Sequence, residues 1–220
     1  MTVQEFVEQV RLRMGDLTPN LQGATTTYDY ALELLTTSTR EFYDLLPYHA
    51  LPAKTITVLS EPQSGDPPSP PDTNNTNPPV LHSTGSGVNV WHLSLPTDYI
   101  RLIEFKCSGW EQSATVIPYG SDIQRMQYRD YLYGGTSNPK VTVININVPT
   151  VEFYTKYAIN PITPTIEKCI YGYNAIVTDM PERLHEAYIW YIVSQVYNSM
   201  EEKGAAETAL NKCLSIIKQW

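Results

Sequence analysis

The residue types closest to a catalytic pattern lie in the stretch PTDYIRLIEFK, residues 96–106. Asp98 is followed by Glu104 and, two positions later, by Lys106. Two carboxylates can hold Mg²⁺ while a lysine polarises the attacking water. Glu104 and Lys106 would lie on one face of a strand, because side chains alternate with a period of two. The spacing therefore allows metal-dependent hydrolysis.

The rest of the sequence argues against this chemistry. Glu-x-Lys is common on solvent-facing strands, so a match of this length has a high false-positive rate. The chain has 15 basic and 23 acidic residues, a net charge of −8, and no run of basic residues. DNA binding needs clustered Lys and Arg. A metal-dependent nuclease using Asp98, Glu104 and Lys106 is kept as an alternative hypothesis.

Other reactive residues form no site in the sequence. The four histidines and three cysteines are scattered, and no CxxC pair indicates zinc or a redox centre. No motif in the sequence combines a nucleophile, a base and an oxyanion site. We predict that the protein is not an enzyme and that it uses no metal or cofactor.

Helical patterns occupy both ends of the chain. Thr2 and Glu5 fit a capping box, and a second helix is predicted from about Thr27 to Leu46. Near the other end, Asp179 and Glu182 suggest another capping box. This capping box would begin a helix that runs to Lys203. Gly204 would end that helix, and a last helix would follow.

A section of period-two alternation lies between these ends. The stretches KTITVLS and VNVWHLSL flank residues 61–87, which contain seven prolines and no periodic apolar pattern. We expect these flanks to pair in one antiparallel sheet. VTVININV and VEFYTKYAI predict a hairpin, TPTIEKCIYG an edge strand or irregular return, and residues 121–132 a short helix.

These patterns predict an α+β fold. Residues 1–50 and 179–220 would form an antiparallel helical bundle. Residues 51–178 would form an inserted antiparallel β section with an extended loop at 61–87, all within one structural unit. Within the bundle, Ala187–Met200 has no charged residue. Such a helix is either the centre of the core or meets another subunit on one side.

Three stretches resemble the head–tail connector, or adaptor, proteins of tailed phages, especially short-tailed podovirus-like or crAss-like ones. They are TYDYALELLTTSTREFYDLLP, LSLPTDYIRLIEFKCSGW and MPERLHEAYIWYIVSQVYNSMEEKGAAETALNKCLSIIKQW. The resemblance implies a structural virion protein at the head–tail junction, assembled in the host cytoplasm, and no membrane. Its partners would be copies of itself in a ring, typically twelve, the portal protein and the next tail or ring protein. Genomic DNA would pass through the lumen without specific binding.

A tail-completion or stopper ring at another level of the particle is a further alternative. The 16 tyrosines suit wet, tightly packed interfaces. We expect the Pro-rich segment to lie as an extended arm along a neighbouring chain, since it lacks apolar residues to bury. The predicted partner contacts are Pro67, Pro70, Asn75, Pro79, Tyr128, Tyr131, Tyr133, Trp190 and Trp220.

Overall fold

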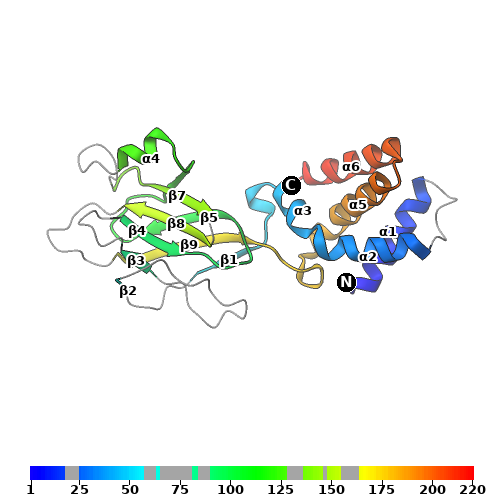
Figure 1. Ribbon diagram of the computed structural model, residues 1–220, viewed down its shortest axis with the longest axis horizontal. Helices are drawn as coiled ribbons and strands as arrows, with labels where there is room; N and C mark the ends of the chain where they lie inside the picture. The colour runs from blue at the N-terminus through cyan, green and yellow to red at the C-terminus, as the bar shows by residue number, and fades with distance from the viewer. Residues whose placement is uncertain are drawn as a thin grey trace. The chain divides into compact units, whose positions relative to one another are not determined.

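The computed structural model divides the chain into two compact units, which we describe separately (Figure 1). Met1–Pro52 and Asn174–Trp220 form a helical unit, and Ala53–Tyr173 form a β unit. The structure describes residues 1–17, 25–56, 63–64, 81–83, 90–127, 136–145, 148–154 and 164–220.

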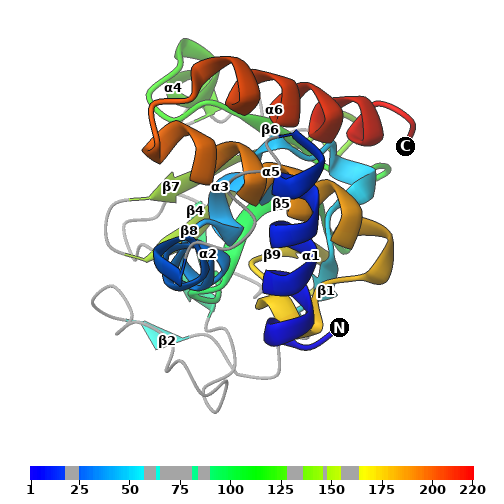
Figure 2. The ribbon, with the colours of Figure 1, turned by 90° about the vertical axis from the view of Figure 1, so that its right-hand side faces the viewer.

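The helical unit is built from both ends of the chain. Its long helices pack around α5, which contacts α1, α2 and α6 (Figures 1 and 2). Its elements are α1 (Val3–Leu17), α2 (Thr25–Thr37), α3 (Thr39–Leu45), η2 (Tyr48–Ala50), η3 (Val177–Asp179), α5 (Glu182–Ser199) and α6 (Lys203–Ile217).

Helix α5 is the centre of this core. Its residues from Ala187 to Val193 are all buried. Two of its tyrosines remain hydrogen-bonded there, because an unpaired buried hydroxyl would be costly. Tyr188 donates to the Leu35 carbonyl (2.9 Å) and Tyr197 to the Met14 carbonyl (2.9 Å). The apolar helix is thus covered by helices of its own unit.

The N-termini of α1 and α5 test the two capping boxes predicted from the sequence. The capping box of α1 is confirmed: the Thr2 amide donates to Glu5 Oε2 (2.7 Å), and the Glu5 amide donates to Thr2 Oγ1 (3.2 Å). The one proposed at Asp179 and Glu182 is wrong. Asp179 ends the short η3, and α5 begins after Pro181 without a side-chain cap.

Two predicted helix boundaries also need correction. The single helix expected from Thr27 to Leu46 is interrupted at Ser38, between α2 and α3. The break between the last two helices precedes Gly204, which lies inside α6. Glu201 makes that turn with φ of 61°, a left-handed conformation that few non-glycine residues adopt.

The β unit contains two sheets and the short helix α4 (Asp122–Gln127). One sheet has the order β1-β9-β5 and the other β2-β3-β4-β8-β7-β6. The strands are β1 (Ala53–Thr55), β2 (Gln63–Ser64), β3 (Leu81–Ser83), β4 (Val90–Ser94), β5 (Tyr99–Cys107), β6 (Thr115–Ile117), β7 (Lys140–Asn145), β8 (Pro149–Tyr154) and β9 (Ile166–Tyr173).

One apolar cluster joins the two sheets. Trp91, Leu93 and Phe153 come from the larger sheet, and Phe105 and Cys169 come from the smaller one. Side chains alternate along a strand. The residues of β4 and β8 that precede or follow these core residues therefore project from the opposite face of the larger sheet. That second face carries His92 and Glu152.

The strand pairing differs from the expectation around residues 61–87. Strand β1 pairs with β9, whereas β4 pairs with β3 and β8, so the two flanks lie in different sheets. Strands β2 and β3 lie in the segment expected to lack regular structure. Alternation reveals the faces of a strand but not its partner, which explains the error.

The other strands are closer to expectation. The hairpin of β7 and β8 is confirmed, with Asn145 opposite Pro149. Strand β9 is the central strand of its sheet, not an edge strand. The helix expected at residues 121–132 is described as α4 up to Gln127, and the remainder lies outside the described residues.

The hydroxyl of Tyr188 provides a test of the helical core. Tyr188→Phe should lower the free energy of unfolding by about 1 kcal/mol, because the Leu35 carbonyl loses its donor. Denaturant unfolding followed by helical circular dichroism measures the change. Tyr30→Phe, at an exposed position of α2, is the matched control. Equal stability of both variants and the wild type would show that the bond contributes nothing.

Candidate functional site

The structure does not bring Asp98, Glu104 and Lys106 together. Asp98 lies just before β5, where its Oδ2 accepts from Lys54 Nζ (2.8 Å) and its Oδ1 from the Tyr171 hydroxyl (3.1 Å). Glu104 lies six positions further along the extended chain, a span of about 20 Å. The two carboxylates therefore cannot share one Mg²⁺.

Glu104 and Lys106 each have another partner on or beside β9. Glu104 Oε1 accepts from Ser113 Oγ (2.6 Å) and Lys168 Nζ (3.2 Å), and Lys106 pairs with Glu167 (2.9 Å). The Ser113 hydrogen bond, helped by Lys168, lowers the pKa of Glu104 despite slight desolvation. These are cross-strand contacts of a solvent-facing sheet surface.

The cysteines offer no reactive centre. Cys107, Cys169 and Cys213 are free and buried. Burial raises the pKa of Cys169 and of Cys213 to about 12, and that of Cys107 further still, so each remains a protonated thiol near neutral pH. Among the side chains that the structure describes, no three His, Cys, Asp or Glu residues form a group that could hold a metal ion.

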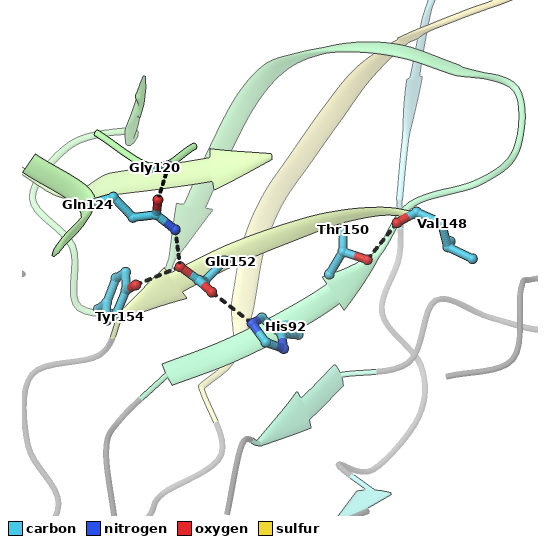
Figure 3. Close-up of polar contacts among 7 residues, drawn as sticks. All are labelled: His92, Gly120, Gln124, Val148, Thr150, Glu152 and Tyr154. Carbon is cyan, nitrogen blue, oxygen red and sulfur yellow. Dashed lines mark hydrogen bonds and ion pairs between the residues drawn. The ribbon is translucent and has the colours of Figure 1, made fainter. Parts of the chain in front are cut away.

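A buried carboxylate on β8 is the main polar site (Figure 3). The side chain of Glu152 is 5% exposed, and its Oε2 lies 3.0 Å from His92 Nε2 on β4. Its Oε1 accepts from the Tyr154 hydroxyl (2.6 Å) and from Gln124 Nε2 (2.8 Å). The amide of Gly120 donates to Gln124 Oε1 (2.5 Å), which orients the Gln124 amide group.

These donors decide the charge of Glu152. Burial raises the pKa of its carboxyl, but hydrogen bonds from His92, Tyr154 and Gln124 outweigh burial and leave the pKa below its ordinary value. Glu152 is therefore ionised at neutral pH. This site is not apparent from the sequence because His92 and Glu152 lie far apart in the chain. The available signal was a polar residue within an apolar alternation on each strand.

Most of the predicted partner contacts lie outside the described residues: Pro67, Pro70, Asn75, Pro79, Tyr128, Tyr131 and Tyr133. Trp190 is 6% exposed; its ring lies 5.8 Å from the Arg13 guanidinium and 4.0 Å from Lys212 Nζ. Trp220 is partly exposed, and its carbonyl lies 2.9 Å from His49 Nε2. Contact of these two tryptophans with a partner stays a prediction.

Two sets of exposed apolar side chains each lie close together in the chain. Val116, Tyr119, Ile123 and Met126 lie on β6, on α4 and on the turn between them. We call these four residues the α4 patch. Leu45 and Tyr48 are exposed on α3 and η2 of the helical unit. Clustered exposed apolar groups mark surfaces for protein contact.

Comparison with known families decides the identity. The family model of the SU10 adaptor protein matches residues 1–219. The chain belongs to the SU10 adaptor protein family. The resemblance to phage head–tail adaptors is confirmed at this level. Membership implies a structural role in the virion together with other virion proteins. A search of curated proteins found no match.

Within the described part of the chain, no helix is both long enough and apolar enough to cross a membrane.

The Glu152 network makes stability depend on pH. The carboxylate has a folded-state pKa below its ordinary 4.5, so its stabilising effect is present above pH 4.5 and is lost as pH falls through the folded pKa. Glu152→Gln should lower the free energy of unfolding at pH 7 by about 1–3 kcal/mol.

Calorimetric unfolding at pH 7 and at acidic pH measures this effect. The difference between wild type and Glu152→Gln should shrink in acid, and Glu111→Gln, at an exposed position, should match the wild type throughout. A difference between the wild type and Glu152→Gln that is unchanged by acid would contradict the assigned ionisation.

Proposed function

We propose that this adaptor-family protein forms a closed oligomeric ring beneath the portal, where it joins the capsid to the tail and extends the DNA channel. The match of the family model to nearly the whole chain carries the proposal. By resemblance to phage head–tail connectors, the ring would contain twelve copies. An adaptor role also favours a structural protein over an enzyme.

The surface chemistry supports contacts between copies. The α4 patch lies on the β unit, whereas Leu45 and Tyr48 lie on the helical unit. A head-to-tail interface joins two different surfaces of the same protein, and such interfaces close into rings when the rotation permits. Two chemically matched but different apolar surfaces suit that kind of contact.

The charge distribution suits a conduit. The helical unit has 13 acidic and seven basic residues, and the β unit has ten acidic and eight basic residues. Neither unit therefore has a net positive charge that would retain phosphate groups. DNA would pass the ring without specific binding.

Assembly on the portal tests the role of the α4 patch. Ile123→Glu places a charge among exposed apolar side chains, so it should reduce ring assembly on purified portal at least tenfold. Mass photometry of portal–adaptor mixtures measures the assembled fraction. The control is Asn211→Glu, which adds the same charge at an exposed position of α6. Wild-type protein that stays unbound at all concentrations would contradict the ring itself.

Residues 63–78 provide a second assembly test. Their deletion removes only the two-residue strand β2 of the described strands and ends before β3, so it should leave the unfolding temperature nearly unchanged. If this Pro-rich stretch contacts a neighbouring chain, the deletion should weaken assembly on the portal in the same mass photometry experiment. Assembly equal to that of the wild type would remove the arm from the proposal.

A further inference from the structure

The larger sheet of the β unit ends in two edge strands. Among the strands that the structure describes, β2 and β6 are the outermost members of this sheet. Strand β2 pairs with β3 on one side, and β6 pairs with β7 on one side. The other side of an edge strand presents backbone N–H and C=O groups that a strand of another chain can pair with. Both edges are therefore candidates for contact through the backbone.

The outward backbone groups of β6 belong to Val116. The Thr115 amide donates to the Pro139 carbonyl (2.9 Å), so the backbone of Thr115 faces β7. Successive residues of a strand direct their N–H and C=O groups to opposite sides, so those of Val116 point away from β7. The side chain of Val116 is also 44% exposed. An incoming strand could therefore reach both the backbone and the side chain of Val116.

Strand β6 lacks the features that usually keep an edge from pairing. Proteins protect edges with charged side chains, prolines or β-bulges. Residues 115–117 are Thr, Val and Ile, and their register with β7 is unbroken. The other three residues of the α4 patch follow directly in the chain, on the next turn and on α4. The edge of β6 is thus apolar, and the most exposed apolar side chains of the β unit follow it in the chain.

The two edges of the sheet run in opposite directions. Strand β2 is parallel to β3, and β6 is parallel to β7. Between them, the pairs β3–β4, β4–β8 and β8–β7 are all antiparallel, which makes three reversals of direction. A second copy that continues the sheet in the same orientation would therefore place its β2 antiparallel to β6. Antiparallel pairing is the slightly more stable arrangement per residue.

We propose that β6 of one copy pairs with the outer edge of β2 of the next copy, so that the larger sheet continues from copy to copy. This contact rests on the proposed ring and gives it a head-to-tail backbone joint. Pairing of β6 with another β6 would instead stop at a two-fold dimer. Because β2 has only two residues, the backbone bonds would set the register, and the α4 patch would supply the apolar contact.

Disulfide trapping on the portal tests which strands meet. Val116→Cys combined with Gln63→Cys should give a ladder of linked adaptor multimers when the assembled protein is oxidised with diamide, because paired strands bring Cβ atoms within disulfide range. Ser64→Cys in place of Gln63→Cys covers a register shifted by one residue. The native cysteines are buried and free. Asn211→Cys with Gln63→Cys, at an exposed position of α6, is the control and should give no ladder.

Backbone substitution at Val116 provides a second measurement. Val116→Pro removes an N–H that points away from β7, so the unfolding temperature should stay close to that of the wild type. Assembly on the portal, followed by mass photometry, should fall by about tenfold because the joint loses a donor. Val116→Thr retains the N–H and the shape of the side chain, and should assemble like the wild type.

The outcomes separate this contact from the ring itself. Wild-type rings that form on the portal, but in which neither pair of cysteines gives a link between copies, would overturn the pairing and leave the ring intact. Linked dimers of Val116→Cys alone would overturn it in favour of two-fold pairing. Assembly of Val116→Pro equal to that of the wild type would also overturn it. Wild-type protein that never assembles would instead contradict the ring, and the contact with it.

Discussion

The pairing of β1 with β9 is the contact on which the organisation of the chain depends. The β unit begins at Ala53 and ends at Tyr173, and β1 pairs with β9 such that Ala53 lies opposite Gly172. The inserted unit therefore starts and finishes at neighbouring strands. This closure lets residues from both ends of the chain share one helical core without a long connection between them.

The same strand also supports the β core. Strand β9 is central in its sheet, with β1 on one side and β5 on the other. Its Cys169 lies in the cluster between the sheets, and the Tyr171 hydroxyl holds Asp98 at the start of β5. Lys54 of β1 reaches the same carboxylate and lies 3.9 Å from the Tyr173 ring centre. The acid that first suggested catalysis thus helps to fix three strands at one end.

Signals between residues close in the chain predicted structure better than pairings between distant ones. The Thr2–Glu5 capping box and the β7–β8 hairpin depend on contacts within a few residues of each other. The partner of β1 is more than a hundred residues away, and alternation does not encode such a partner. Asp179 failed as a cap because Pro181 holds the start of α5 and the preceding residues form η3. The family was predicted correctly although the pairing of β1 was not, because the resemblance depended on stretches of sequence and not on strand pairing.

The buried site could not be predicted for the same reason, yet it links the sheet to the exposed surface of α4. A helix as short as Asp122–Gln127 is not stable by its own hydrogen bonds. Gln124 anchors it through Glu152, and burial of the charged carboxylate is offset by the donors gathered around Oε1 and Oε2. Ile123 and Met126 are exposed on the same helix. The apolar surface proposed for assembly therefore depends on a charged group buried on the sheet beneath it.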